Sequence, residues 1–278
     1  MLVIKTVEEL QDVMFRVHSS GKSVGMVPTM GALHDGHLSL IKRAHRENRV
    51  TVCSIFVNPT QFNNKEDLEK YPRTLDDDLK LIEDYVDIVF APTAEEVYKE
   101  PATEHYDFGD LEKVMEGPMR PGHFNGVAII VKRLFDWVKP EKAYFGEKDF
   151  QQIAIIKSLV KQYHLDIEIV PCPIVREASG LALSSRNKRL SEYEHKQAAN
   201  IYRILQESTR LDTTDVAKIR QFVADEIAKV DTFRLEYYEI VDGETLQPIQ
   251  NLDETDSVVG CITVYCGEVR LIDNIRYK

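Results

Sequence analysis

The chain has 278 residues, enough for one large domain or two modest ones, and its composition of 43% hydrophobic and 29% charged residues is typical of globular proteins. A formal charge of −11 argues against a protein that mainly coats nucleic acid or an anionic membrane, because such binding depends on many contacts from Lys and Arg to phosphates. The 4 cysteines form no CxxC pair, no apolar segment is long enough to cross a bilayer and the first residues contain no export signal, so we expect a cytoplasmic protein with free thiols.

Alternating helices and strands are predicted over the first 175 residues. Thr6 and Glu9 have the spacing of a capping box, and apolar residues then recur at helical spacing until Gly21 ends the first helix. Short apolar segments predict buried strands at residues 23–29, 50–57, 87–92, 142–149 and 167–175. Helical periodicity lies between them, at residues 37–48, 76–86, 124–138 and 151–164. This order predicts an α/β fold, a Rossmann-like doubly wound parallel sheet.

The pattern changes after about residue 175. Two long helical stretches, 191–211 and 214–230, lead to strands at 233–242 and 257–277, the last with a turn at Gly267. We therefore expect a Rossmann-like domain over residues 1–175 and a smaller α+β domain over residues 176–278 that covers the active site. Ligands of parallel sheets bind outside the carboxyl ends of the strands, and polar clusters follow several of the predicted strands.

The segment PTMGALHDGH, residues 28–37, follows the first predicted strand and leads into a helix. Its glycines and Pro28 favour a tight turn, and the helix N-terminus offers backbone N–H groups that attract an anion. His34 and His37 could then donate hydrogen bonds to a phosphate. A metal site that includes Asp35 is one alternative, although ligands so close together in a turn rarely converge, and a structural role for the histidines is another.

The segment FVNPTQF, residues 56–62, ends the next strand with Asn58 and Gln61. Neutral amides suit the recognition of hydroxyl and carboxylate groups, but Asn-Pro also opens ordinary capped turns.

The segment FGEKDFQQ, residues 145–152, places Lys148 and Asp149 between a strand and a helix. Lysine suits a phosphate, and the carboxylate could position it or bind a Mg²⁺ ion that bridges phosphates; the alternative is a solvated loop. Gln151 and Gln152 open the helix, where their side chains could turn back toward a ligand.

The segment LALSSRN, residues 181–187, carries Ser184, Ser185 and Arg186 in a predicted loop. Hydroxyls with a guanidinium can clamp a phosphate. A serine nucleophile is the rival interpretation, but the sharp GxSxG turn is missing.

Two other stretches carry weaker signals. Arg120 and His123 precede a helix and could contact an anion or form an ordinary loop. Residues 66–87 are rich in Asp and Glu, which predicts a solvated face, with Arg73 as the exception.

Taken together, PTMGALHDGH, FVNPTQF, YPRT, PMRPGHFNGV, FGEKDFQQ and LALSSRN have the order and spacing of the pantoate–β-alanine ligases of coenzyme A biosynthesis. The chain resembles this family over nearly its whole length. The family belongs to the nucleotidyltransferases with an HxGH signature, here residues 34–37, which is related to the HIGH motif of class I aminoacyl-tRNA synthetases.

The resemblance implies an ATP-dependent ligase with two half-reactions. The carboxylate of pantoate attacks the α-phosphate of ATP and releases pyrophosphate, and β-alanine then displaces AMP from the pantoyl adenylate. It also implies small-molecule substrates only, with no nucleic acid or membrane partner, Mg²⁺ as the companion of ATP, and a homodimer formed by the N-terminal domains.

The resemblance also assigns residues by position. Catalytic roles go to His34, His37, Lys148 and Arg186. The ATP site would consist of Met30, Gly31, Ala32, Leu33, His34, Asp35, Gly36, His37, Gly146, Glu147, Lys148, Asp149, Val175, Leu183, Ser184, Ser185 and Arg186. Pantoate and β-alanine would lie against Pro28, Met30, Asn58, Gln61 and Gln152, and Asp149 would help to bind Mg²⁺. Leu183 stands where the family often has Met, and Lys188-Arg189 replace a common aromatic residue; these differences affect only adenine packing and loop charge.

Three other functions remain as alternatives. A cytidylyl- or adenylyltransferase would leave the nucleotide on its product, but FVNPTQF and FGEKDFQQ argue against it. A tRNA synthetase would need a basic tRNA-binding module, which this short acidic chain lacks. A nucleotide-binding or metal-sensing module would bind without turnover. Because acyl adenylates hydrolyse readily, we expect the site to close, with residues 63–74 as the gate.

Overall fold

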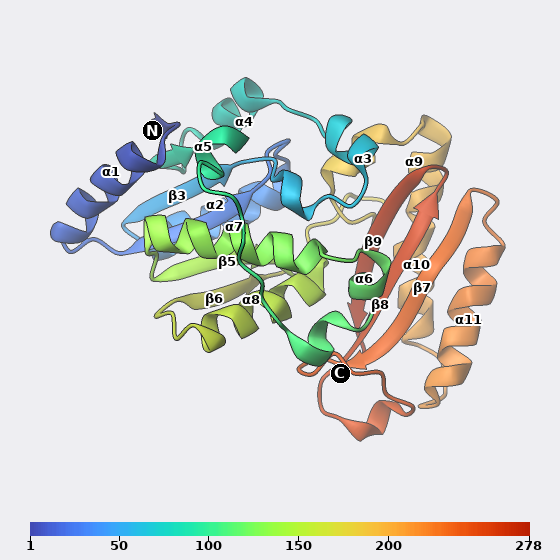
Figure 1. Cartoon of the computed structure of the whole chain (residues 1–278). Coiled ribbons are helices and arrows are strands. Elements are labelled where there is room, and N and C mark those ends of the chain that lie inside the picture. Colours follow the sequence, from blue (N-terminus) through green and yellow to red (C-terminus); the bar gives the residue numbers. More distant parts are fainter. The chain divides into compact units, whose positions relative to one another are not determined.

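The computed structural model describes residues 1–278, which divide into two compact units (Figure 1). The first unit comprises Met1–Phe108, Met119–Glu147 and Gln152–Pro173. The second comprises Gly109–Pro118, Lys148–Gln151 and Ile174–Lys278. The chain therefore crosses between the units more than once, and two short internal segments belong to the second unit. No helix has the length and apolar character needed to span a membrane.

A six-stranded parallel sheet forms the centre of the first unit, with strand order β1-β4-β3-β2-β5-β6. Its strands are β1 (Leu2–Ile4), β2 (Val24–Thr29), β3 (Val50–Ile55), β4 (Ile88–Phe90), β5 (Lys142–Gly146) and β6 (Glu168–Cys172). The predicted parallel α/β fold is confirmed. The prediction does not include strand β1, because a strand of three residues is too short to show a pattern.

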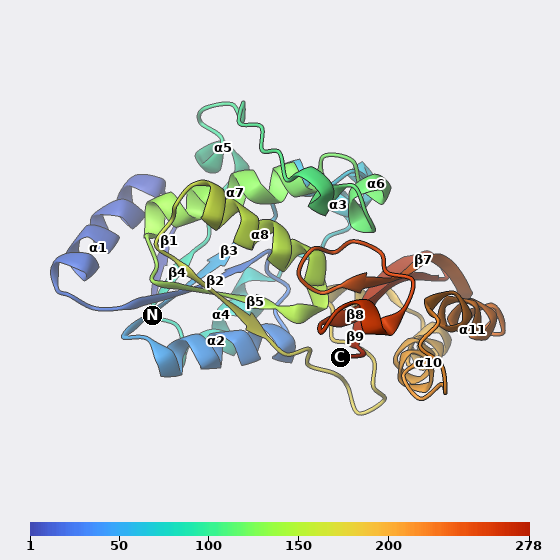
Figure 2. The same cartoon turned by 90° about the horizontal axis from the view of Figure 1, so that it is seen from below.

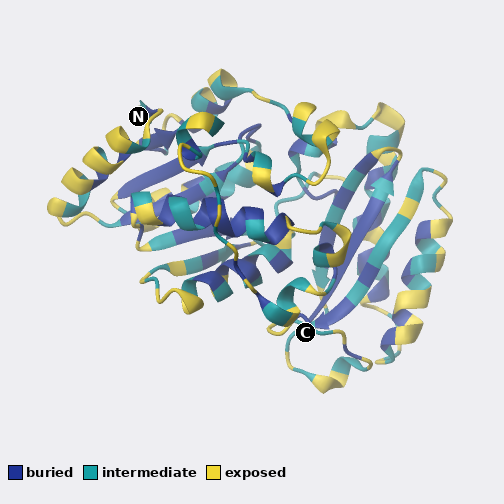
Figure 3. Ribbon diagram, viewed as in Figure 1, coloured by how far each residue is buried: buried dark blue, intermediate teal, exposed yellow.

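Helices cover both faces of this sheet, with α7 and α8 on one face and α2 on the other (Figure 2). The helices are α1 (Val7–Ser19), α2 (Asp35–Glu47), α3 (Lys65–Glu69), α4 (Leu75–Ile82), α5 (Ala94–Val97), α7 (His123–Val138) and α8 (Phe150–Gln162), with a 3₁₀ turn η1 (Pro59–Gln61). As predicted, the Thr6 hydroxyl accepts the Glu9 N–H, at 3.3 Å, and caps α1. Strands β2 to β4 are largely buried, as expected for strands covered on both faces (Figure 3).

The second unit contains an antiparallel sheet of β7 (Phe233–Asp242), β8 (Val258–Cys266) and β9 (Val269–Arg276), in that order. The predicted turn at Gly267 is confirmed, and its φ of +54° explains the glycine. The remaining elements are α6 (Glu116–Met119), α9 (Glu192–Ala198), α10 (Asn200–Ser208), α11 (Val216–Ala228), and the 3₁₀ turns η2 (Gly109–Glu112), η3 (Glu147–Asp149), η4 (Ser185–Arg189) and η5 (Leu252–Glu254). The single helix predicted at 191–211 is wrong, since α9 and α10 are separate helices that meet at Ala199.

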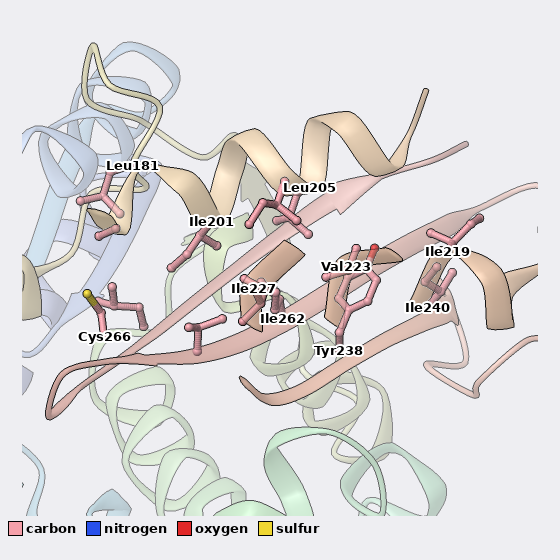
Figure 4. Packing of buried hydrophobic residues seen from close by; sticks show 14 of the residues in the cluster. Leu181, Ile201, Leu205, Ile219, Val223, Ile227, Tyr238, Ile240, Ile262 and Cys266 are labelled. Atoms are coloured by element: carbon pink, nitrogen blue, oxygen red, sulfur yellow. The ribbon is translucent and has the colours of Figure 1, made fainter. Parts of the chain in front are cut away.

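Apolar side chains at helical spacing pack α10 and α11 onto this sheet (Figure 4). Ile219, Val223 and Ile227 of α11 are at most 1% exposed and lie in one cluster with Tyr238 and Ile262 of the sheet. Burying one such side chain stabilises the fold by about 1.5–3 kcal/mol. The cluster therefore holds the three strands as a rigid support.

A buried ion-pair cluster ties the internal segment Gly109–Pro118 to the rest of the second unit. Both carboxylate oxygens of Glu116 accept hydrogen bonds from Arg270, at 2.8 Å each, and one also accepts the Tyr237 hydroxyl, at 2.7 Å. Arg270 pairs with Glu236 as well. Burial by itself lowers the pKa of Arg270, but the two carboxylates more than offset this and raise it. The cluster is charged and fully paired.

Replacing Glu116 with Ala should lower the free energy of unfolding by about 3 kcal/mol, because Arg270 would keep only one of its two carboxylate partners in a buried site. Urea unfolding followed by circular dichroism measures this loss. The matched control is Glu192→Ala, which removes an exposed ion pair with Lys196 and should cost less than about 1 kcal/mol. Equal losses for the two variants would contradict the stabilising role of Glu116.

Candidate active site

The strand order places a ligand-binding edge between β2 and β5. From β2 the chain continues to β3 and β4 on one side of the sheet, while β5 and β6 extend the other side. A crevice outside the carboxyl ends of the strands forms where the order reverses in this way. The segment after β2 carries the two histidines of the HxGH motif, and Gly146 and Glu147 stand at the end of β5. Two of the predicted ATP-binding segments therefore begin at the switch point of the sheet.

The turn after β2 has a left-handed backbone at two successive residues. The φ angle is +81° at Gly31 and +50° at Ala32, so regular strand pairing ends here. A Cβ at Gly31 would lie 3.0 Å from a methyl group of Ile55 and 3.1 Å from a carboxylate oxygen of Asp78, which leaves little room for any other residue. The Thr29 hydroxyl accepts the Gly31 N–H, at 3.2 Å, and closes the turn.

Asp78 of α4 holds this turn from the other side. One carboxylate oxygen accepts the Ala32 N–H, at 2.9 Å, and the other accepts the Leu33 N–H, at 2.8 Å, and the Thr74 hydroxyl, at 3.1 Å. Asp78 is only 3% exposed. The prediction that residues 66–87 are a solvated acidic face is therefore wrong at Asp78. The signal that could have revealed it is the spacing of four residues to buried Ile82, which puts both on one face of the helix.

His34 and His37 lie side by side at the N-terminus of α2. The ring centroids are 4.1 Å apart. His34 is the N-cap residue, and its Nδ1 accepts the Gly36 N–H, at 3.1 Å. Because Nδ1 accepts, the proton of a neutral ring sits on Nε2, which makes that nitrogen a donor. Asp35 is the first residue of the helix. The two imidazoles therefore stand at the positive end of a helix of 13 residues, where an anion is favoured.

Polar contacts surround the buried side chain of Gln61 in η1. Its side-chain oxygen accepts a hydrogen bond from Asn58 Nδ2, at 3.1 Å, and its Nε2 lies 2.9 Å from the sulfur of Met30. Asn58 also donates to the carbonyl oxygen of Gly126 in α7, at 3.1 Å. Pro28, another predicted substrate contact of this unit, lies in β2 opposite Ser54. The structure thus brings together Asn58, Gln61 and Met30, three of the predicted substrate contacts.

Arg120 and His123 fix the backbone of Gln61. His123 Nδ1 lies 2.8 Å from the Gln61 carbonyl oxygen, and Arg120 Nη1 lies 3.1 Å from His123 Nε2. The carbonyl can only accept and the guanidinium can only donate, so in these two contacts Nδ1 of His123 donates and Nε2 accepts. Arg120 also donates to the same carbonyl, at 3.3 Å. Arg73, the exception made within the acidic run, donates to the backbone carbonyls of Leu68 and Tyr71.

In the second unit, Lys148 and Asp149 form an ion pair with 3.5 Å between nitrogen and oxygen. The neighbouring Gln151 is buried, and its amide is fully used: it accepts the Glu116 N–H and donates to the carbonyls of Leu111 and Val114. The expectation that Gln151 turns toward a ligand is therefore wrong, since its hydrogen bonds hold Gly109–Pro118 in place. Gln152, the next residue, belongs to the first unit.

The remaining predicted ATP-binding residues form a compact loop in the second unit. The Val175 carbonyl accepts the Leu183 N–H, at 3.0 Å, which brings the two ends of the loop together. The Ser184 hydroxyl accepts the Arg186 N–H, at 3.2 Å, and caps η4. Ser185 is buried. The Ser184 oxygen therefore caps η4 while its hydroxyl proton can still be donated to a ligand, which suits a phosphate contact better than a nucleophile.

No three His, Cys, Asp or Glu side chains are grouped to hold a metal ion by themselves. A single carboxylate such as Asp149 fits a Mg²⁺ ion that is bound mainly by phosphates and water, which is the usual arrangement for Mg²⁺ with nucleotides.

Comparison with known proteins follows this geometry. The family model described as pantoate-beta-alanine ligase matches residues 2–276. The chain is 58% identical over 280 residues to the pantothenate synthetase of Bacteroides fragilis, covering 100% of this chain and 99% of that protein. It is 52% identical to the pantothenate synthetase of Porphyromonas gingivalis over 280 residues, covering 100% of both.

Two solved structures extend this likeness to the fold. The crystal structure of pantothenate synthetase from Thermus thermophilus matches with a TM-score of 0.93 at 42% identity, covering 100% of this chain and 99% of that one. The pantoate-beta-alanine ligase of Francisella tularensis, complexed with beta-gamma ATP and beta-alanine, matches with a TM-score of 0.84 at 35% identity, covering 100% and 98%.

Replacing Asp78 with Asn should loosen the turn after β2, because a near-isosteric amide puts N–H groups where backbone N–H donors must be accepted. An unpaired buried donor costs about 1–3 kcal/mol of unfolding free energy. Hydrogen exchange at the Ala32 and Leu33 amides should accelerate selectively. Asp77→Asn is the control, since Asp77 is the exposed neighbour in the same helix turn. If the Ala32 and Leu33 amides exchange hydrogen at the same rate in both variants, Asp78 does not hold the turn.

Proposed function

This chain belongs to the pantoate–β-alanine ligase family, and from that membership we propose how its residues divide the work of the reaction. The enzyme condenses pantoate with β-alanine to pantothenate, using ATP, by way of a pantoyl adenylate, and releases AMP and pyrophosphate. The observation that carries this conclusion is the match to the family over the full length of the chain.

The first half-reaction joins two anions, so it needs donors and positive charge around the α-phosphate. A carboxylate oxygen of pantoate forms a bond to the α-phosphorus while the bond to the bridging oxygen of pyrophosphate breaks. We assign His34 and His37 to the phosphates, because the Nε2 proton of His34 and the N-terminus of α2 provide donors. Lys148 and Arg186 supply the cationic charge that the transition state needs.

The other nucleotide contacts are proposed by position. Residues 30–37 follow the phosphates from the turn after β2, where the backbone is held by Asp78. Residues 146–149, Val175 and residues 183–186 complete the ATP site, with Asp149 as the protein ligand of a Mg²⁺ ion that enters with ATP. When bound, that ion neutralises phosphate charge.

Pantoate carries hydroxyl groups, which neutral amides recognise without adding charge. We assign Gln61 and Gln152 to them, with Asn58, Met30 and Pro28 lining the same pocket. Support comes from the direct contacts of Gln61 with Asn58 and Met30. In the second half-reaction the amine of β-alanine attacks the acyl carbon, the C–N bond forms, the bond to the AMP oxygen breaks and the amine loses a proton.

We also propose a homodimer formed by the N-terminal domains, a cytoplasmic location and a C-terminal domain, residues 176–278, that covers the active site, with residues 63–74 as the gate. The exposed Phe15 and Leu2 of the first unit suit an interface between copies. Four buried free cysteines and the use of ATP suit the cytoplasm. Light scattering of the purified protein should give twice the mass of one chain.

Substituting His37 or Lys148 with Ala should slow adenylate formation by on the order of 10²–10³-fold, because each removes a donor to the developing phosphate charge. Pantoate-dependent exchange of labelled pyrophosphate into ATP, without β-alanine, measures this step. His45→Ala, an exposed position at the far end of α2, and Lys157→Ala, an exposed position of α8, are the matched controls. A variant of His37 or Lys148 that exchanges at the control rate would remove that residue from the mechanism.

Substituting Gln61 with Ala should raise the apparent KM for pantoate about tenfold, which is the weight of one lost hydrogen bond in a buried pocket. The KM for ATP should change little, since Gln61 is assigned to pantoate alone. Gln11→Ala, at an exposed position of α1, serves as the control. An unchanged KM for pantoate would count against the pocket.

A further inference from the structure

Two adjacent residues of β9, Asp273 and Asn274, each hold a different ATP-binding segment of the second unit. We propose that they are positioning residues for adenylation, which set Lys148 and the loop of residues 183–186 relative to each other. The proposal rests on the proposed function of those segments. Both side chains are buried, with 5% and 8% of their surface exposed.

Asp273 fixes the loop through Arg176. The two side chains form a bidentate pair, with distances of 2.6 Å and 2.9 Å between the guanidinium nitrogens and the carboxylate oxygens. Burial raises the pKa of Asp273, and the pairing with Arg176 counteracts that shift. Arg176 also donates to the Gly180 carbonyl, at 3.2 Å, and stacks on Tyr202 at 3.6 Å. Arg176 also donates to the Asn274 carbonyl, at 3.4 Å, so four groups together fix the position of the guanidinium.

The fixed position of Arg176 constrains the proposed ATP-binding loop through backbone hydrogen bonds. Arg176 pairs with Ala182 in an antiparallel bridge, and the adjacent Val175 carbonyl accepts the Leu183 N–H. Ser184 and Arg186 follow directly in η4. The guanidinium held by Asp273 is therefore only one residue from Val175, which is one edge of the proposed ATP site.

Asn274 fixes Lys148. Its Nδ2 donates to the Lys148 carbonyl oxygen, at 3.2 Å, while its own backbone N–H is accepted by an Asp273 carboxylate oxygen, at 2.8 Å. Lys148 lies in the 3₁₀ turn η3, where three residues provide few backbone hydrogen bonds of their own. The carbonyl that Asn274 holds thus fixes the base of the lysine side chain.

Strand β9 is well suited to this task. It pairs with β8 on one edge only, at positions that include Ile262 opposite Asp273 and Cys261 opposite Asn274. The sheet is held rigidly by the core under α10 and α11. Segments 148–149 and 183–186 are far apart in the sequence, but their anchors are consecutive residues whose Cα atoms are about 3.8 Å apart. Small displacements of reacting groups cost large factors in rate, so this common anchor matters for catalysis.

The test removes the donor at Asn274 and leaves its size unchanged. Asn274→Asp replaces the amide with a carboxylate, which cannot donate a hydrogen bond to the Lys148 carbonyl oxygen. We expect the rate of adenylate formation, measured with enzyme in excess of ATP, to fall on the order of tenfold to a hundredfold, with an unchanged KM for pantoate. The buried carboxylate lowers the urea midpoint, so circular dichroism first verifies that the variant is folded under the assay conditions. Asn200→Asp is the matched control: Asn200 also donates to a carbonyl of the second unit, that of Gln197, at 3.0 Å. Asp273→Asn serves less well, because an unpaired buried Arg176 could prevent folding.

A second arm asks whether Asn274 acts through Lys148. In the Lys148→Ala background, Asn274→Asp should add no further loss, because the side chain that it positions is gone. The proposal is overturned if Asn274→Asp lowers the rate of adenylate formation by the same factor with Lys148 present and with Lys148→Ala. It is also overturned if the Asn274→Asp enzyme forms adenylate as fast as the Asn200→Asp enzyme. A normal rate for Lys148→Ala instead overturns the catalytic role given to Lys148, and with it the reason to position this residue. Slow Lys148→Ala with a normal Asn274→Asp overturns the positioning role alone.

Discussion

In the first unit, the turn that leads to His34 and His37 depends on one buried carboxylate, that of Asp78. The turn after β2 must leave the sheet through two residues with a left-handed backbone, and the N–H groups that this exposes cannot pair with a strand. Asp78 accepts two of them from a helix that lies 45 residues further along the chain. Water could not replace it at so buried a position without a cavity. Because α2 begins two residues after Leu33, the direction of His34 and His37 follows from this contact.

Other proposed ligand-binding segments outside regular helices and strands are held in the same way, by side chains that hydrogen-bond to their backbone. Gln61 sits in a 3₁₀ turn whose carbonyl is held by His123 and Arg120, and Lys148 sits in another whose carbonyl is held by Asn274. In each case a buried polar side chain on a helix or strand binds the backbone of the segment and leaves its functional side chain uncommitted to that bond. Rigid elements thus define the site while irregular segments carry its chemistry.

Much of the fold could be predicted because its signals are local. Buried parallel strands are continuous apolar runs, and the cap at Thr6 and the turn at Gly267 are decided by residues within three positions. The anchors could not be predicted, since an Asp or Asn looks the same in a sequence whether its partner is water or a backbone N–H from another segment. Asp78 was hidden in an acidic run for that reason, and Gln151 looked like a ligand-binding amide although its bonds are used within the fold.

The proposed catalytic residues are distributed over the two units of the chain. Glu147 and Lys148 are consecutive, yet the first belongs to the unit with the histidines and the second to the unit with Arg186. The turn after β2 is fixed by Asp78 within one unit, and the proposed catalytic lysine by Asn274 of β9 within the other. Each of these groups thus depends on an anchor within its own unit, where a rigid helix or strand holds the irregular segment that carries it.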